Sequence, residues 1–200
     1  FIFRRFKEHY SFNIDMLFRL DYKRFDFGCS IVKIESERLI IENFSENDVA
    51  SWAEIERDPR VRRYIDGKTL SYDQAKAYVY RNIDEFNKKG FSRYAVRYKR
   101  NGRLIGMCGF LEEAYGIDFG YRYTPAFWGM GIGFEAAKIV LELGMTRPKP
   151  ITVYGIVAVN NFGSIRILER LDFRYIGQTI MHGLKALKYS FVMKNIARES

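Results

Sequence analysis

Cysteine and histidine are scarce in this chain of 200 residues, which contains two of each. Cys29 and Cys108 have neither a metal-ligand spacing nor the density of a disulfide framework. We therefore expect no metal site, and we expect Cys108 to be a small core residue of a strand. The sequence also offers no Ser-His-Asp or Cys-His arrangement, so it does not indicate a covalent acyl-enzyme.

Long apolar runs are also missing. No stretch approaches the roughly 18 residues that a membrane-spanning helix requires. Charged residues repeatedly interrupt the early chain, unlike a signal peptide. We expect a cytoplasmic protein that has no membrane contact.

Basic residues are in excess, and the formal net charge is +9. This balance suits an acidic or RNA-bearing partner such as a ribosome, but it is equally typical of an ordinary basic surface. The tightest basic group consists of Arg60, Arg62 and Arg63 in a short helical segment. We interpret this group as solvated, and we expect no direct DNA binding.

The first 30 residues differ from the rest of the chain. They are rich in Phe and Tyr, carry charges throughout and follow no clean period. We interpret residues 1–30 as an N-terminal appendage, with a docking helix at Asn13–Leu20 as one possibility. Residues 31–200 are interpreted as a single domain.

From Arg38 onwards, patterning predicts alternating strands and helices. Ser71 and Gln74 form a capping box for a long helix that Gly90 ends. Asn101-Gly102 predicts a tight hairpin. Strands are expected at 38–44, 92–99, 103–113, 117–123, 151–159, 174–180 and 187–193, and further helices at 46–57, up to 145 and after 161. The fold class is therefore α/β, mixed α+β, with a mostly antiparallel mixed sheet of about six to seven strands flanked by helices.

The most informative motif is a run of alternating glycines, Gly129, Gly131 and Gly133, that opens a helix. Such a backbone can approach an anion closely, and the first helical N–H groups point towards it. The motif thus predicts a pyrophosphate cradle. A dinucleotide site is disfavoured, because Thr124–Trp128 separates the strand from the glycines and no ribose-binding acid follows at the required distance. Glycines that merely allow close packing of a strand and a helix are the alternative.

Three blocks carry a resemblance to a known family. Asp118-Phe119-Gly120-Tyr121, then Pro125, then 128–136 resembles the acetyl-CoA signature of the GNAT N-acetyltransferases. Trp128 is typical of the subgroup that contains the ribosomal-protein N-terminal acetyltransferases. Residues 161–173 resemble a second block of that subgroup, with Asp172 where the family has Gly, and 35–41 resembles its first strand. The resemblance covers roughly residues 33–195.

The resemblance implies a GNAT-like fold with a cleft for acetyl-CoA between two splayed strands. The splayed parts would be Gly120–Tyr123 and Val153–Val157, with Tyr121 and Tyr123 as cleft walls. Asn161 would contact the pantetheine arm. The phosphates would be held by the backbone amides of Met130, Gly131, Ile132, Gly133 and Phe134.

The implied reaction is direct transfer of an acetyl group from acetyl-CoA to a primary amine in a ternary complex. In the subgroup, a serine at the position of Ser164 is the usual candidate to protonate the departing thiolate. Other members use a tyrosine seven residues after the asparagine, and this chain has Leu168 there.

The general base is left open among three possibilities, of which a hairpin carboxylate is favoured because a negative group there could also attract a cationic amine. Glu112, Glu113 and Asp118 stand near the second hairpin, and alternate strand positions should turn Glu112 and Glu113 to opposite faces. His182 follows the last block, and an ordinary imidazole suits deprotonation of an amine. A water chain is the third possibility.

The acceptor is a small-molecule amine or a protein N-terminus, with a ribosomal protein as one case. A catalytically silent CoA-binding module is the alternative function. A monomer or a homodimer is expected.

Overall fold

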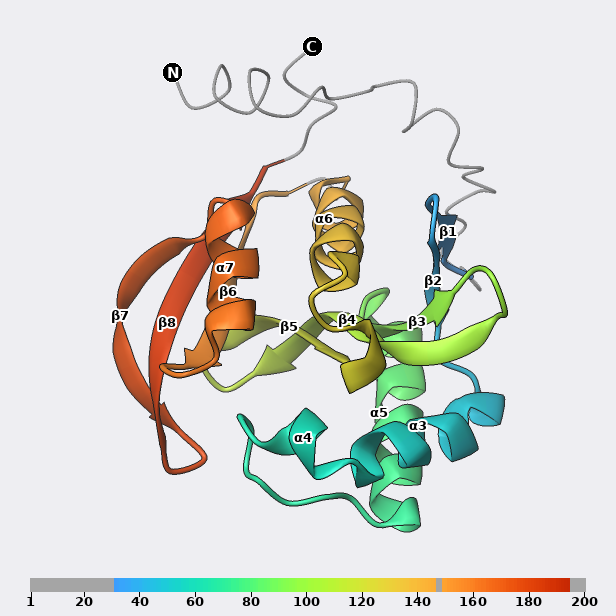
Figure 1. Cartoon of the computed structure of the whole chain (residues 1–200). Helices are drawn as coiled ribbons and strands as arrows, with labels where there is room; N and C mark the ends of the chain where they lie inside the picture. Colours follow the sequence, from blue (N-terminus) through green and yellow to red (C-terminus); the bar gives the residue numbers. More distant parts are fainter. Residues whose placement is uncertain (1–30, 147–148, 195–200) are drawn as a thin grey trace. The chain divides into compact units, whose positions relative to one another are not determined.

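The computed structural model describes residues 31–146 and 149–194 (Figure 1). The interpretations of residues 1–30, including the helix at Asn13–Leu20, lie outside this part. The strands are β1 Lys33–Glu35, β2 Leu39–Asn43, β3 Arg93–Tyr98, β4 Arg103–Glu113, β5 Gly116–Tyr123, β6 Ile151–Ala158, β7 Arg174–Met181 and β8 Leu184–Met193. The helices are α3 Val49–Arg57, α4 Pro59–Arg62, α5 Tyr72–Lys89, α6 Ile132–Met145 and α7 Phe162–Arg170, with 3-10 turns at Glu46–Asp48 and Pro125–Phe127.

The eight strands form one sheet in the order β1-β2-β3-β4-β5-β6-β8-β7. Neighbouring strands are antiparallel except β5 and β6, which are parallel. The mixed, mostly antiparallel sheet expected from the sequence is therefore confirmed. It has one strand more than the seven expected segments, because Lys33–Glu35 pairs with β2 across a short turn.

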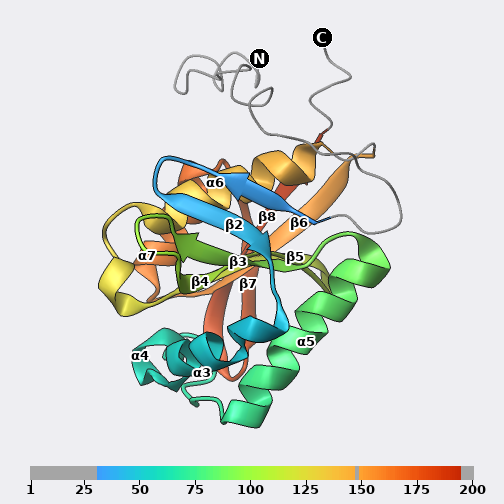
Figure 2. The ribbon, with the colours of Figure 1, turned by 90° about the vertical axis from the view of Figure 1, so that its right-hand side faces the viewer.

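Helices cover both faces of the sheet. Figures 1 and 2 show α6 and α7 on one face and α3, α4 and α5 on the other. On the first face, Ala136, Ala137 and Val140 of α6 are fully buried, as expected. On the second, Trp52 is fully buried and stacks on Tyr78, with ring centroids 5.0 Å apart. β5 therefore runs between two separately packed layers.

Local sequence signals explain the helix ends. The N–H of Gln74 donates to Ser71 Oγ at 3.2 Å, and the Ser71 N–H donates to Gln74 Oε1 at 2.9 Å, which completes the expected capping box of α5. Gly90 ends α5 with a φ of 71°. The helix expected from residue 46 begins instead with a 3-10 turn, in which Asp48 accepts from the Ser45 N–H and hydroxyl.

The last two strands are joined by a tighter turn than the sequence indicated. β7 and β8 extend to Met181 and Leu184, and only His182 and Gly183 connect them. Both adopt left-handed backbone, with φ of 50° and 80°. Asp172 is also left-handed, with a φ of 59°, which agrees with its standing where the family has Gly.

Two expectations about side chains have opposite outcomes. Cys108 is fully buried, as expected, and burial raises the pKa of its thiol to about 12. Arg62 is not solvated, because its guanidinium lies 2.7 Å from Glu56 Oε2 and 2.7 Å from Asp66 Oδ2. Arg60 and Arg63 are exposed. The described helices include none long and apolar enough to cross a bilayer.

Candidate active site

The sheet opens between its two parallel strands. β5 and β6 pair at only two positions, Ile117 with Val153 and Asp118 with Tyr154. Both strands then continue without pairing to each other, while β6 pairs with β8 on its other side. The expected splay is therefore present, although Val153, which we had placed in the splayed part, still pairs with β5. The facing backbone groups beyond this point have no strand partner within the described sheet, and an extended ligand can pair with them.

The glycine loop lies between the end of β5 and α6. Gly129 and Gly131 have φ of 74° and 77°, a left-handed backbone that favours glycine. Gly131 is the N-cap of α6, and the first helical hydrogen bond runs from the Glu135 N–H to the Gly131 carbonyl at 3.1 Å. The N–H groups of Ile132 and Gly133 precede that bond, so they have no intrahelical acceptor.

The third glycine has a packing role. A Cβ on Gly133 would lie 3.0 Å from Ile167 Cδ1 and 3.2 Å from Tyr123 Cε2. On β6, a Cβ on Gly155 would lie 2.9 Å from Leu168 Cδ2. The packing explanation therefore applies to Gly133, which allows α6, α7 and β5 to approach, whereas Gly129 and Gly131 set the turn of the loop.

The loop fits a phosphate group. A Cβ on Gly131 would meet only Arg38 Nη2, at 3.6 Å, and Met130 is half-exposed. The Ile132 side chain is fully buried, so only its backbone N–H is available to a ligand. The positive end of the helix dipole favours an anion at this point. Phe134 lies in the same turn, 3.8 Å beneath the guanidinium of Arg170.

Ser164 and Tyr121 meet beside the opening, on the face that carries α6 and α7. Asn161 caps α7, and its Oδ1 accepts from the Ser164 N–H at 3.3 Å. Ser164 Oγ donates to the Tyr121 hydroxyl at 3.1 Å, and this hydroxyl donates to the Ser164 carbonyl at 2.9 Å. Burial raises the pKa of Tyr121, so the phenol stays protonated at neutral pH.

Trp128 ties the glycine loop to the end of β5. Its indole Nε1 donates to the Tyr123 carbonyl at 2.8 Å. The Arg63 guanidinium lies 5.6 Å from the Trp128 ring centroid and 4.5 Å from that of Tyr64. The segment after α4 therefore reaches the loop. Tyr123 is itself buried with the hydrophobic core.

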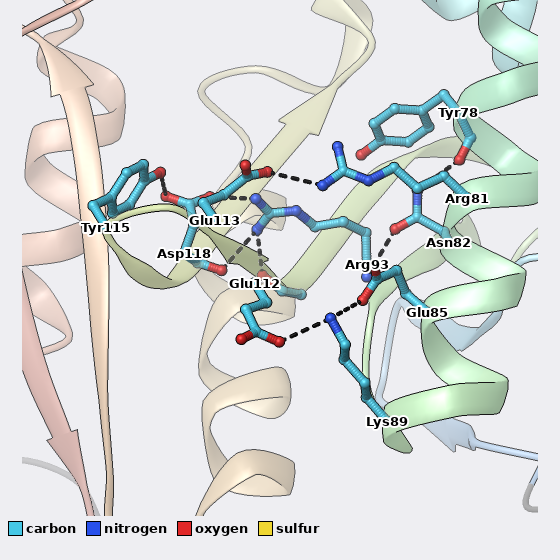
Figure 3. A network of polar contacts seen from close by, with 11 residues as sticks. Tyr78, Arg81, Asn82, Glu85, Lys89, Arg93, Glu112, Glu113, Tyr115 and Asp118 are labelled. Carbon is cyan, nitrogen blue, oxygen red and sulfur yellow. Dashed lines mark hydrogen bonds and ion pairs between the residues drawn. The ribbon is translucent and has the colours of Figure 1, made fainter.

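Two of the base candidates lie at the end of β4, away from Tyr121. Glu113 pairs with Gly116 at the hairpin end, whereas Tyr121 pairs with Cys108 nearer the middle of β4. Figure 3 shows both glutamates reaching α5. Glu112 lies 2.8 Å from Lys89 Nζ, and Glu113 lies 3.3 Å from Arg81 Nη2.

Asp118 lies at the point where β5 and β6 separate, but its oxygens have protein partners (Figure 3). The buried Arg93 guanidinium donates to its carboxylate and, at 2.5 Å, to the Gly109 carbonyl. The Tyr115 hydroxyl donates to Asp118 Oδ1 at 2.7 Å. Burial and then the Asp118 charge raise the pKa of Tyr115. A Cβ on Gly120 would lie 2.7 Å from Arg93 Nη1, so this position needs glycine.

His182 stands at the tip of the β7–β8 hairpin. The last pairing of β6 with β8 is Ala158 with Ala186, so the hairpin tip extends beyond the end of β6. The imidazole is exposed and makes no hydrogen bond or ion pair with any other described residue.

Sequence reasoning missed several charged residues around the site. Glu56 is fully buried and accepts from Arg62 at 2.7 Å and from Arg122 at 2.9 Å. Arg38 binds Glu135 in the first turn of α6. These partners are 6, 66 and 97 positions apart in the chain. No local pattern could connect them, although the alternation along β5 does turn Arg122 to the face opposite Tyr121.

The described ranges contain no cluster of three or more His, Cys, Asp or Glu suited to hold a metal ion. The expected chemistry needs none, since proton transfer and alignment suffice for acetyl transfer to an amine.

Several known proteins are similar to this chain. An N-acetyltransferase of Bacillus subtilis strain 168, YnaD, which is uncharacterized, is 28% identical over 151 residues, covering 72% of this chain and 84% of that protein. The fold matches a GNAT-family acetyltransferase from Bacillus anthracis, with a TM-score of 0.70, 23% identity and coverage of 81% and 99% of the two chains. It also matches RimL, a ribosomal L7/L12 alpha-N-protein acetyltransferase in complex with coenzyme A, with a TM-score of 0.71, 17% identity and coverage of 83% and 99%.

The family model for the acetyltransferase (GNAT) domain matches residues 38–174, more than half of the chain. The matched range contains the opened strands, the glycine loop and Ser164. The chain therefore belongs to the GNAT family of acetyl-CoA-dependent acetyltransferases.

Proposed function

We propose that this chain transfers an acetyl group from acetyl-CoA to a primary amine by direct attack in a ternary complex. One observation carries the proposal: β5 and β6 separate beside both the phosphate-sized loop at α6 and the Ser164–Tyr121 pair. A donor whose phosphates lie at α6 can therefore extend its pantetheine arm along the opened strands towards Ser164.

The cofactor contacts follow from this placement. The amides of 130–134 hold the phosphates, and the unpaired edge of β5 at Tyr121 and Tyr123 lines the cleft. Asn161 uses Oδ1 to cap α7, which leaves its Nδ2 group as the donor for an amide carbonyl of the pantetheine arm.

Ser164 is proposed as the general acid. In the reaction, the amine nitrogen forms a bond to the thioester carbonyl carbon, and the bond from that carbon to sulfur breaks. The sulfur takes a proton from Ser164 Oγ, the amine loses a proton to a base, and Ser164 regains a proton from the protonated base through solvent. Tyr121 is kept neutral by burial, and its hydroxyl orients Ser164 by accepting from Ser164 Oγ and donating to the Ser164 carbonyl.

His182 is the favoured base among the side chains. Glu112 and Glu113 are each ion-paired with α5, at the hairpin end of β4. Asp118 is held by Arg93 and Tyr115. His182 has no such engagement with the described residues and lies on a turn that extends beyond the end of β6. A water chain is the alternative proton acceptor.

The acceptor class has two candidates, a protein N-terminus and a small-molecule amine. RimL is described as an alpha-N-protein acetyltransferase of ribosomal L7/L12, which supports the first class. The net charge of +9 would also favour a ribosomal partner. A small-molecule amine remains the second candidate, because membership of the family does not distinguish a protein N-terminal amine from the amine of a small molecule.

The decisive experiment measures thiol release from acetyl-CoA on addition of amines. The panel contains peptides with the N-termini of ribosomal proteins, the same peptides with blocked N-termini, and small polyamines. Release with free but not blocked peptides assigns a protein N-terminus, and release with polyamines assigns a small amine. CoA binding without thiol release across the panel would instead favour the silent CoA-binding module.

A further inference from the structure

An acid occupies the first turn of α6, where the proposed function places the phosphates of acetyl-CoA. This acid is Glu135, whose side chain is 19% exposed. A carboxylate near a helix N-terminus is favourable for the helix itself. Without a partner, however, it would repel a bound pyrophosphate across a few ångströms.

Two residues of the β1–β2 turn neutralise this carboxylate. Ser36 Oγ donates to Glu135 Oε1 at 2.6 Å. Arg38 Nε donates to Glu135 Oε2 at 2.7 Å, and Arg38 Nη2 lies 2.5 Å from the same oxygen. Together they donate to both carboxylate oxygens: the charged guanidinium of Arg38 binds Oε2, and the neutral hydroxyl of Ser36 binds Oε1.

The same guanidinium also contacts the glycine loop. Arg38 Nη1 donates to the Met130 carbonyl at 2.9 Å. Nη2 lies 3.6 Å from the place of a Cβ on Gly131. Arg38 therefore bridges the acid of the helix and the backbone of the loop that precedes it.

The turn that carries Arg38 is fixed. The Ser36 N–H donates to the Leu39 carbonyl at 2.9 Å, and the Leu39 N–H donates to Ser36 Oγ at 3.0 Å. The N–H of Lys99, after β3, donates to the Arg38 carbonyl at 2.8 Å, and its Nζ lies 2.8 Å from Glu35. The guanidinium is thus presented from a braced turn, which limits the entropy lost in placing it.

We propose that Arg38 is a positioning residue for the phosphate end of acetyl-CoA. It acts by neutralising Glu135 and by holding the Met130 carbonyl, so that the N-terminal amides of α6 face an anion without a competing negative charge. This inference rests on the proposed function, because it assumes that the phosphates lie at α6.

The test measures CoA binding by calorimetry at fixed ionic strength. Arg38→Met should raise the Kd about tenfold, as expected for the loss of a charge-assisted contact set. Glu135→Gln should leave the Kd within about twofold of wild type or lower it, since it removes the repulsive charge. The double variant should bind within about threefold of wild type, because the two residues act as a coupled pair.

A donor without phosphates separates positioning from general damage. With acetyl-pantetheine, Arg38→Met should retain the kcat/KM of wild type, because no phosphate is present to be repelled. Lys88→Met is the matched control: it removes an exposed cation and its ion pair with Asp84 on α5, and it should leave the Kd for CoA unchanged.

Clear results would overturn the proposal. Unchanged CoA binding by a folded Arg38→Met would do so, as would a double variant that binds no more tightly than Arg38→Met. If Arg38→Met does not fold, weaker CoA binding by Glu135→Gln decides against it. Failure of the wild-type chain to bind CoA would refute the proposed function itself.

Discussion

The two faces of β5 carry different kinds of side chains. On one face, Tyr121 meets Ser164 and Tyr123 packs against Gly133, so this surface consists of neutral rings, hydroxyls and backbone. On the other, Asp118 pairs with Arg93 and Arg122 pairs with Glu56. Uncharged groups next to the opening leave it free for an extended ligand, whereas charges on the opposite face are already matched by protein.

This difference in charge indicates which face of β5 takes part in the reaction and which face contributes to the stability of the fold. A hydroxyl beside an unpaired strand edge can exchange its hydrogen-bond partner, here Tyr121, for a ligand without breaking an ion pair. A buried carboxylate between two guanidinium groups cannot change its charge or its partners without leaving a buried ion uncompensated. We therefore expect substitutions on the α7 side to affect turnover, and substitutions on the α3 side to affect folding.

The largest effect should come from Ser164→Ala. General-acid catalysis is typically worth about 100- to 10,000-fold, so turnover should fall by that factor. The Kd for CoA should change little, since Asn161 still caps α7 through the backbone N–H of residue 164. Single-turnover kinetics and calorimetry measure the two quantities. A turnover number within a factor of two of wild type would remove Ser164 as the acid.

Tyr121→Phe is the companion variant on the same face. It removes the hydroxyl that orients Ser164 but retains the ring that stacks against Tyr123. We expect a smaller loss of turnover than for Ser164→Ala, about tenfold, with CoA binding retained.

On the opposite face, Glu56→Ala should destabilise the fold. It leaves the guanidinium groups of Arg62 and Arg122 without their shared carboxylate. Removing one partner of a buried pair typically costs about 3–5 kcal/mol. Urea unfolding gives the value, and Glu54→Ala, an exposed acid of the same helix, is the control. A loss below about 1 kcal/mol would contradict the role assigned to this buried acid.

The base can be tested through the pH dependence of the acetylation rate at subsaturating amine. If His182 is the base, His182→Ala should remove the acidic limb of the profile and slow the reaction, whereas Glu113→Gln should change little. The amine's own ionisation enters kcat/KM, so one amine is used throughout. The reverse pattern would assign the base to Glu113 at the β4–β5 hairpin. Two unchanged profiles would leave water as the proton acceptor.

The same contrast explains what the sequence could predict. The Gly129–Gly133 loop, the Ser71 capping box and the Asn101-Gly102 turn are local, because each depends on residues a few positions apart. Their structures agree with prediction. The site of splaying came from the family resemblance and not from periodicity, and the order of the strands in the sheet came from the structure alone.

The α3 side could not be predicted in the same way. Glu56 occupies a helix position that a sequence shows as an ordinary acid, and it is buried only because Arg62 and Arg122 converge on it. The Arg38–Glu135 contact joins two residues that lie 97 positions apart in the chain. Pairings of this kind follow from the assembled sheet, so only the structure identifies them. His182 was named from its position, but its left-handed turn was not foreseen.

Gly131→Val sharpens the comparison because it alters the glycine loop and leaves the polar side chains of both faces of β5 in place. A β-branched residue at a φ of 77° is strained, and its side chain projects towards Arg38. We expect CoA to lose most of its stabilising effect, which at 100 times the Kd is about 2.7 kcal/mol. Thermal unfolding with and without CoA measures this. Gly102→Val, with a φ of 67° and no atom near its Cβ, carries the same strain away from the site and should keep the CoA shift. A full shift in Gly131→Val would contradict the cradle.

The smallest effects should have opposite signs on the two faces. Burial opposes the charge of Asp66, but the hydrogen bonds and charge of Arg62 together with the backbone hydrogen bond from Lys68 lower the pKa of Asp66 below its ordinary value. Burial raises the pKa of Glu142, on α6, above 4.5, against the weaker effect of Lys138. A group whose pKa is lower in the folded state stabilises the fold at pH values above its unfolded pKa, and this stabilisation is lost as the pH falls through the folded pKa. A group whose pKa is higher in the folded state stabilises the fold only at low pH, and this stabilisation is lost as the pH rises through the folded pKa.

At pH 7, Asp66→Asn should therefore destabilise the fold, and the difference should shrink below about pH 4. Glu142→Gln should stabilise the fold at pH 7, and that gain should also disappear in acid, where the carboxyl is already neutral. Each effect should be about 1 kcal/mol or less, because both groups retain some solvent contact. Urea unfolding of both variants and wild type from pH 3 to pH 7 gives the curves. Differences of the same sign at pH 7 would show that the two faces of the sheet do not differ in how they hold charge.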